Sequence, residues 1–234
     1  FSLFAYSLVV GQNYNWSFGL GTDNAEAITS LDTDDQGHVY SCGYFQDNLD
    51  FDFSNGTHVL NIQGPEDIFI QKTSVDGNFI WAKSIGSVAA DQARDIKVDG
   101  DGDVITVGSF GAAADFDPGA GSFNMSPYTV NWNGFAVKLD DNGDFIWAKQ
   151  CGEVGNTFIE CTEVDNLGNI YLGGFFENQV DLDPNGTVDS HTSAQNNDGF
   201  IVKLDLNGNF IWSHILESDS TISPQSISFD ENGS

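Results

Sequence analysis

The chain has 234 residues, 40% of them hydrophobic, which is enough apolar surface for a globular core. Its 35 acidic residues outnumber 7 lysine and arginine residues, for a formal net charge of −28. Such a surface repels phosphate backbones and anionic membrane faces, so we expect no nucleic-acid binding and no membrane insertion of the mature domain. Two interpretations of the charge stay open: a hydrated surface that prevents self-association, or the binding of cations.

Residues 1–11 form an uncharged apolar run that is too short to span a bilayer as a helix. We interpret them as the remnant of a secretory signal peptide, with Val9 and Gly11 before a cleavage point at Gln12. The alternative is an ordinary strand of the fold. Because no methionine or basic segment precedes the run, we expect the chain to be cut at its start. A signal peptide predicts a protein that is secreted or displayed at the cell surface.

A repeat organises the rest of the chain. Residues 78–83, Asn-Phe-Ile-Trp-Ala-Lys, recur in similar form at 144–149 and 209–214, with a fainter copy at 14–17. The tryptophans at positions 16, 81, 147 and 212 are 65, 66 and 65 residues apart. A fixed period of this size is typical of architectures in which each unit buries its apolar face against its neighbour.

Each period contains the same elements in the same order. A first strand ends in an Asp-x-x-Gly turn, as at residues 34–37, where Asp bonds its own backbone and Gly accepts positive φ. A second strand, a variable segment, a third strand, a glycine turn and the tryptophan strand follow. No segment has helical periodicity, and several strands are apolar on both faces. This pattern predicts an all-β fold, a β-propeller of four-stranded blades, with a β-solenoid as the alternative.

The predicted blades span residues 24–88, 89–153 and 154–218. We expect residues 12–23 to form the fourth strand of a partner blade and residues 219–234 to begin the next one. About three complete blades fall short of the roughly four to eight of a closed ring. We therefore expect an open arc of a larger ring, truncated at both ends and continued by further blades and domains of the same polypeptide.

Three motifs recur nearly intact. Ile-x-Val-Asp-x-x-Gly-x-Val-x-x-x-Gly spans residues 96–108, Phe-x-x-Lys-Leu-Asp-x-Asn-Gly-x-Phe-x-Trp spans 135–147 and 200–212, and Asp-Phe-Asp-Pro lies at 115–118. In these motifs the chain resembles the bacterial seven-bladed β-propeller repeat (SBBP-type) family of large secreted and surface proteins, over nearly everything from residue 14 onward. The first copy departs from the pattern at Thr73-Ser74 and at Phe53. The resemblance implies an exported protein with further anchoring or sorting domains, and no established activity.

The variable segments carry Asp-x-Asp pairs, at Asp50 and Asp52, Asp115 and Asp117, and Asp181 and Asp183. Residues two apart on a strand point to the same face, so each pair presents two hard oxygen ligands of the kind that Ca²⁺ prefers. Calcium is therefore a candidate ligand. The alternative is turn structure, because Asp-Pro sequences commonly start turns and no complete calcium loop is present.

The remaining candidates are mostly structural. We expect the repeated tryptophans to pack in the core or between blades, and the repeated lysines at 72, 83, 138, 149 and 203 to form ion pairs that join blades. Trp132 lies outside the repeat pattern in a polar variable loop, which makes it the candidate for contact with a ligand. Cys42 and Cys151 occupy positions typical of buried free thiols. Cys161 aligns with polar residues, and a Cys151–Cys161 disulfide is an alternative.

No Gly-x-Ser-x-Gly turn and no histidine pair at zinc spacing occurs in the sequence. We therefore predict a non-catalytic exported propeller module for binding, adhesion or scaffolding. Its protein or carbohydrate ligand would contact the variable segments 44–66, 109–133 and 175–198. The alternative is a propeller enzyme, a glycoside hydrolase or a quinoprotein-like oxidoreductase, with its site on the central axis; the Gly-to-Trp spacing of four resembles that of quinoprotein propellers.

Overall fold

The computed structural model describes residues 26–54, 56–186, 188–193, 197–217 and 222–229. These residues form β-strands joined by turns and loops, and they include no helix, so the all-β prediction is confirmed. The described part of the chain accordingly contains no helix long and apolar enough to cross a membrane. The predicted signal remnant (1–11) and the predicted fourth strand of a partner blade (12–23) lie outside the described residues.

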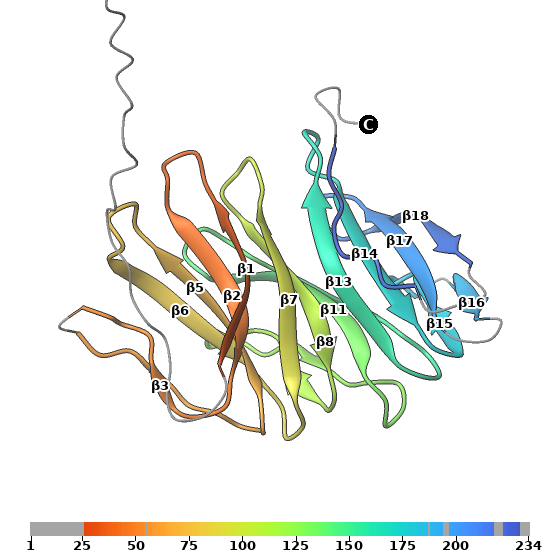
Figure 1. The fold of residues 1–234 in the computed structure, drawn as a ribbon, viewed down its shortest axis with the longest axis horizontal. Helices are drawn as coiled ribbons and strands as arrows, with labels where there is room; N and C mark the ends of the chain where they lie inside the picture. Colours follow the sequence, from red (N-terminus) through yellow and green to blue (C-terminus); the bar gives the residue numbers. More distant parts are fainter. Residues whose placement is uncertain (1–25, 55, 187, 194–196, 218–221, 230–234) are drawn as a thin grey trace, which may run out of the picture.

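Three four-stranded antiparallel sheets follow one another along the chain (Figure 1). Blade 1 has the order β1 (Ala27–Thr33), β2 (Val39–Phe45), β5 (Asp67–Thr73) and β6 (Phe79–Ile85). Blade 2 has the order β7 (Asp91–Val98), β8 (Val104–Phe110), β11 (Asn133–Leu139) and β12 (Phe145–Cys151). Blade 3 has the order β13 (Thr157–Val164), β14 (Ile170–Phe176), β17 (Asp198–Leu204) and β18 (Phe210–Leu216).

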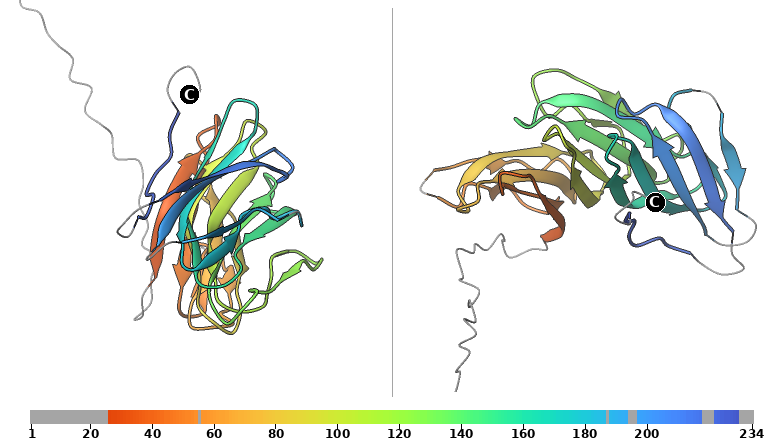
Figure 2. Two further views of the ribbon diagram at one scale, coloured as in Figure 1. Left: turned by 90° about the vertical axis from the view of Figure 1, so that its right-hand side faces the viewer. Right: turned by 90° about the horizontal axis from the view of Figure 1, so that it is seen from above.

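The sheets are arranged as propeller blades. The first strand of blade 2, β7, contacts both β1 and β13, the first strands of its neighbours, and the sheets fan out from them along an arc (Figure 2, right). Strands β5, β8 and β11 are buried at every position because each of their faces is covered. This burial explains why their sequences are apolar on both faces. The predicted partial propeller with four-stranded blades is confirmed.

Each variable segment adds a short hairpin between the second and third strands of its blade, which the sequence did not predict. The pairs are β3 (Leu49–Asp50) with β4 (Val59–Leu60), β9 (Ala114–Asp115) with β10 (Asn124–Met125), and β15 (Gln179–Asp181) with β16 (Ser190–Thr192). The apolar residue inside each Asp-x-Asp pair, Phe51, Phe116 or Leu182, is fully buried. These hairpins therefore extend the core of each blade.

The tryptophan of one blade packs on the glycine turn of the next. The Trp81 indole N–H donates to the Asp141 carbonyl at 3.0 Å, and Trp147 donates to the Leu206 carbonyl at 3.4 Å. A Cβ on Gly143 would lie 3.1 Å from Trp81 Cδ2, and one on Gly208 would lie 3.2 Å from Trp147 Cδ2. Glycine is required at these turns both for its positive φ and for this close approach.

Comparing Gly143→Ala with Gly186→Ala separates the requirement for positive φ from the requirement for space beside the tryptophan. Gly143 has φ +77° and a crowded Cβ position, whereas Gly186 has φ +90° and nothing within 4 Å of its Cβ position. We expect Gly186→Ala to cost about 1 kcal/mol from backbone strain alone, and Gly143→Ala about 2 kcal/mol more from the collision with Trp81. Urea unfolding of both variants checks this, and equal losses would contradict the packing role of Gly143.

All three cysteines are free and buried, so the alternative Cys151–Cys161 disulfide is wrong. Burial raises the pKa of each thiol to about 12. The expectation of a polar environment for Cys161 is also wrong. Its side chain lies between Gly173 and Pro224, because residues 222–229 run along the face of blade 3 that points away from blade 2. Phe229 of that segment contacts Tyr171 edge to face at 4.8 Å.

Candidate functional site

Each blade has two ends with different character. The tight turns between first and second strands and between third and fourth strands lie at one end, which we call the turn face. The described residues of the segments 46–66, 86–90, 111–132, 152–156 and 177–197 lie at the opposite end, which we call the loop face (Figure 1). The turns repeat in sequence and structure, whereas the loop-face segments differ in sequence from blade to blade outside the recurring Asp-x-Asp hairpin.

Two pockets open on the turn face at the junctions between blades. The first, of about 320 Å³, lies between blades 1 and 2 and is lined by Asp34, Asp99 and Asp141, among others. The second, of about 520 Å³, lies between blades 2 and 3 and includes Lys138 and Asp165. Asp34, Asp99 and Asp165 begin equivalent turns, and each accepts backbone N–H groups from residues two and four positions later. The aspartates at these pockets therefore build the turns, as the sequence predicts.

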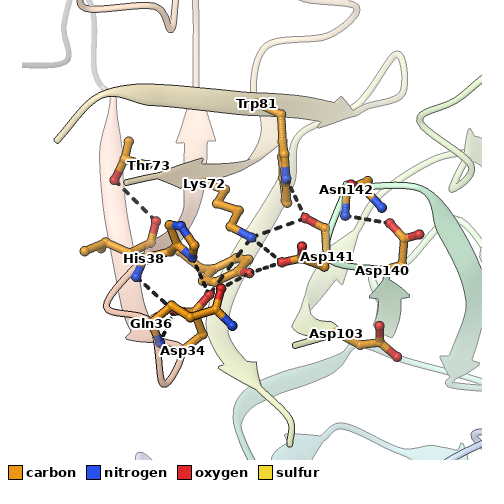
Figure 3. A network of polar contacts seen from close by, with 12 residues as sticks. Asp34, Gln36, His38, Lys72, Thr73, Trp81, Asp103, Asp140, Asp141 and Asn142 are labelled. Atoms are coloured by element: carbon orange, nitrogen blue, oxygen red, sulfur yellow. Dashed lines mark hydrogen bonds and ion pairs between the residues drawn. The ribbon is translucent and has the colours of Figure 1, made fainter. Parts of the chain in front are cut away.

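The network around Lys72 joins blade 1 to blade 2 (Figure 3). Lys72 Nζ lies 4.9 Å from the centre of the Tyr40 ring and pairs with the Asp141 carboxylate from the next blade. The Tyr40 hydroxyl donates to the same carboxylate at 2.8 Å, and Trp81 donates to the Asp141 carbonyl. Hydrogen bonds from Lys72 and Tyr40 lower the pKa of Asp141 below its ordinary value. This network is structural.

The prediction that the repeated lysines join blades is correct only in part. Lys72 and Lys83 reach carboxylates of the next blade, Lys83 at 3.9 Å from Asp144. Lys138 and Lys203 instead pair with aspartates of their own blade, because these lie in the turn beside the third strand. The first strands provide the other links between blades 2 and 3, through Arg94 with Glu160 and Lys97 with Glu163.

The Asp-x-Asp pairs form one turn that recurs in each blade. Oδ1 of the first aspartate accepts the N–H of the second, at 3.0–3.1 Å, and another N–H eight residues after itself, at 2.7–3.0 Å. The second aspartate accepts the N–H two residues later, at 2.8–2.9 Å. Burial raises the pKa of Asp115, but the hydrogen bonds from backbone N–H groups outweigh burial and lower the pKa overall. Backbone N–H groups thus occupy one oxygen of every carboxylate.

Calcium binding at these pairs stays a prediction. Within the described residues no group of three or more His, Cys, Asp or Glu side chains gathers in a way that could hold a metal ion. Thermal unfolding in increasing calcium and then in chelator distinguishes the two interpretations. Site binding predicts a midpoint that rises and saturates, is reversed by chelator, and rises less in Asp115→Asn, which removes one of the three pairs. Turn structure alone predicts a midpoint that calcium leaves unchanged.

The loop face carries a backbone contact that recurs at the blade junctions. The Asp91 N–H donates to the Glu66 carbonyl at 2.9 Å, and the Thr157 N–H donates to the Trp132 carbonyl at 2.9 Å. The Ile222 N–H donates to the Asn197 carbonyl at 3.4 Å in the third copy. Equivalent residues therefore occupy equivalent places at each junction, and their side chains can be compared directly.

The side chains at this repeated contact differ completely. At the junction of blades 1 and 2, Gln92 donates to the Glu66 carboxylate. At the junction of blades 2 and 3, Trp132 lies 6.0 Å from Phe158, and Phe158 stacks on Phe175 at 5.0 Å. Trp132, Phe158 and Phe175 are all partly exposed, and we call them the aromatic row. The structure thus places Trp132, the predicted ligand contact, beside two phenylalanines that the sequence did not single out.

Charge is distributed unevenly between the loop face and the strands. Every lysine and arginine of the chain lies in β5, β6, β7, β11, β12 or β17. The loop-face segments contain aspartate and glutamate but no lysine or arginine. The loop-face segments therefore carry negative charge without lysine or arginine, and the aromatic row lies among them.

The carboxylate whose pKa is raised most is not available for catalysis. Asp91 is fully buried and accepts N–H groups from Ser87 at 2.6 Å and from Gly111 at 3.0 Å. Burial, helped by the nearby Asp67 charge, raises the pKa of Asp91 to about 6 although the hydrogen bonds oppose the shift. No substrate could reach this group, so its position offers no support for an enzyme.

Asp91 nevertheless makes stability depend on pH. Its folded pKa of about 6 exceeds the ordinary value of an aspartate, 3.8, so ionisation of Asp91 leaves the folded state undestabilised below about pH 4 and destabilises it fully above about pH 6. Asp91→Asn removes this charge. The difference in free energy of unfolding between the variant and the unsubstituted protein should therefore shift in favour of the variant by about 3 kcal/mol between pH 4 and pH 8. The lost hydrogen bond costs about 1 kcal/mol at both pH values. Urea unfolding at pH 4, 6 and 8 checks this, and a pH-independent difference would contradict it.

Comparison with known proteins supports the propeller assignment. No protein-family model matches the chain. The chain is similar to the uncharacterized WD repeat-containing protein L264 of Acanthamoeba polyphaga mimivirus, with 24% identity over 182 residues. WD repeats form propeller blades of four strands, as seen in each sheet here. The chain is a propeller repeat module. The match covers 68% of this chain and 13% of that protein, so it spans a small part of its relative.

Proposed function

We propose that the chain is a non-catalytic propeller module that binds a protein partner through its loop face. One observation carries the proposal: the backbone contact repeats at the junctions of the loop face, while the side chains there change from Glu66 and Gln92 to Trp132 and Phe158. Loops on a rigid scaffold are where binding residues concentrate.

The first strands favour binding over catalysis. The carboxylates there are used between blades: Asp95 accepts the Ser30 hydroxyl at 2.6 Å and the Thr162 N–H at 2.9 Å, and Asp32 accepts the Val98 N–H at 2.9 Å. A glycosidase pair would need two carboxylates free to reach one substrate. These contacts support the binding module as the better assignment.

Site-specific photo-crosslinking tests the proposal. A photoreactive amino acid is placed at Val130, which is 99% exposed on the loop face, or at Leu167, which is 79% exposed on the turn face. The full polypeptide is then irradiated in the cells that make it, and adducts are identified by mass spectrometry. We expect a protein adduct at Val130 and none at Leu167. Adducts confined to Leu167, or carbohydrate adducts at Val130, would contradict the proposal.

We further propose that the module belongs to a larger exported protein, as its resemblance to the SBBP-type repeats implies. The uncharged apolar run at residues 1–11 supports export. Fusing residues 1–40 to a reporter enzyme that is active only outside the bacterial cytoplasm tests this. Activity that is lost when residues 1–11 are removed is expected, and equal activity without them would contradict the role of this run.

A further inference from the structure

We propose that the aromatic row, with the Glu177 carboxylate beside it, binds an arginine or lysine side chain from a basic segment of the partner protein. This inference rests on the proposed function, since it assigns the chemistry of the partner that the loop face would bind. The observations that carry it are the geometry of the three rings, the hydrogen bonds that link the Trp132 backbone to Glu177, and the distribution of charge.

The aromatic row offers an accessible π surface. The Trp132 ring is tilted by 30° to the Phe158 ring, and the Phe158 ring stacks on the Phe175 ring at 27°, so Phe158 lies between the other two aromatic side chains in contact with both. Each ring is only partly buried. The loop that leads into Trp132 also exposes Tyr128 by 62% and Val130 by 99%. A partner side chain therefore reaches the row without any rearrangement of the blades.

Hydrogen bonds hold Trp132 and a carboxylate in one rigid unit. The backbone N–H of Trp132 donates to Asn156 Oδ1 at 3.1 Å, and Asn156 Nδ2 donates to Glu177 Oε2 at 2.8 Å. The Glu177 N–H donates back to the Asn156 carbonyl at 2.8 Å. The backbone that carries the indole is thereby fixed and linked to a negative charge before any partner arrives. Such preorganisation favours binding because little freedom is lost when the partner docks.

The chain uses the same combination of ring and carboxylate for its own cations. Lys203 Nζ lies 4.6 Å from the centre of the Tyr171 ring and 3.3 Å from the Asp165 carboxylate. Lys72 is held likewise by Tyr40 and Asp34. These two are the cation–π contacts of the described residues. No lysine or arginine among those residues therefore lies over a ring of the aromatic row in this way. A cation from outside would complete the arrangement, and the acidic loop face would attract it.

Short peptides provide the direct test. Binding of N-acetylated tetra-arginine amide is measured by calorimetry at about 150 mM salt, where long-range attraction is largely screened. The neutral control is the tetra-citrulline peptide, which keeps the shape of arginine and lacks its charge. We expect saturable binding of tetra-arginine and binding of tetra-citrulline that is weaker by roughly tenfold or more. Equal binding of the two peptides would overturn the proposal.

Two matched pairs of variants locate the binding. Trp132→Leu should weaken tetra-arginine binding roughly tenfold, whereas Trp212→Leu, which removes another exposed indole far along the chain in β18, should leave it unchanged. Glu177→Gln keeps an oxygen for Asn156 and removes the charge, so it should weaken binding several-fold without unfolding the blade. Glu217→Gln, outside the row, is its control. Equal affinity in all four variants would mean general charge attraction and would overturn the proposal.

The outcomes separate this inference from the function on which it rests. Protein adducts at Val130 together with peptide results that overturn cation binding would keep the loop-face function and reject only the basic partner. Binding of a neutral oligosaccharide such as maltohexaose, in competition with tetra-arginine and lost in Trp132→Leu, would assign the row to sugars and overturn the inference. Adducts confined to Leu167 would reject the loop-face function itself.

Discussion

Replacing Trp81 with alanine is expected to lower the free energy of unfolding by about 3–5 kcal/mol. The side chain is 9% exposed, and it contacts the Tyr40 ring at 6.2 Å and the Gly143 turn of blade 2. Alanine leaves a cavity between two blades and removes the indole N–H that the Asp141 carbonyl accepts. In a repeat protein, stability is approximately a sum of units and their interfaces, so this loss falls on the blade 1–blade 2 interface.

Trp212→Ala is the matched control for that substitution. Trp212 occupies the equivalent position in β18 and makes the same edge contact with a tyrosine, Tyr171 at 6.1 Å, but it is 40% exposed. Its truncation should cost clearly less than that of Trp81. The free energy of unfolding of both variants is measured by urea unfolding, with the backbone circular dichroism signal in place of tryptophan fluorescence. Equal losses would mean that the tryptophan stabilises its own blade and does not join it to the next.

Replacing Lys138 with methionine is expected to cost about 3 kcal/mol at pH 7, because it leaves two carboxylates without their partner in a largely buried place. Lys138 is 4% exposed, with Nζ at 2.7 Å from Asp99 and 3.1 Å from Asp103. Burial lowers its pKa, but the two carboxylates outweigh this and raise the pKa of the lysine overall. In the unsubstituted protein the contribution of the raised lysine pKa is thus fully present at neutral pH and is lost as the pH rises through the folded pKa of Lys138.

The pH dependence of the variant distinguishes charge from packing. Without Lys138 the two carboxylates repel each other in the folded state, so their folded pKa values rise and the cost of ionisation disappears as the pH falls through them. The difference between Lys138→Met and the unsubstituted protein should therefore shrink from pH 7 to pH 4. Lys149→Met, a half-buried lysine in the same blade that interacts with Asp205 at longer range, is the control and should cost much less. A deficit of unchanged size at pH 4 would indicate lost packing.

Much of the fold could be predicted because the same sequence motifs recur in each blade. Three copies of the Asp-x-x-Gly turn and of the tryptophan strand determine the strand count and the packing of each blade on the next. Gly143 and Gly208, each beneath the tryptophan of the preceding blade, are the positions where the repeat spacing and the packing coincide. Sequence periodicity is strongest where every copy obeys the same physical constraint.

What the sequence left open lies where the copies differ. Phe158 stands where the other copies have Ala27 and Gln92, so a search for repeated residues passes over it. An aromatic residue that breaks the repeat at a position on the loop face was the signal that could have revealed it. Cys161 was misjudged because Ser30 and Asp95 are polar for a local reason: they bond each other between blades, at 2.6 Å. Ser30 and Asp95 are partly buried, whereas Cys161, covered by residues 222–229, is 1% exposed.

Which face binds the partner can be measured by hydrogen exchange on the full polypeptide, with and without the protein captured at Val130. On the loop face, the amides of Gly111, Trp132, Thr157 and Glu177 should exchange more slowly when the partner is bound. The turn amides of Gly102 and Gly168, which donate to Asp99 and Asp165 at 3.0 and 2.9 Å, should exchange at unchanged rates. Slowing confined to the turn face, with the loop-face amides unaffected, would contradict a binding surface built from the variable loops.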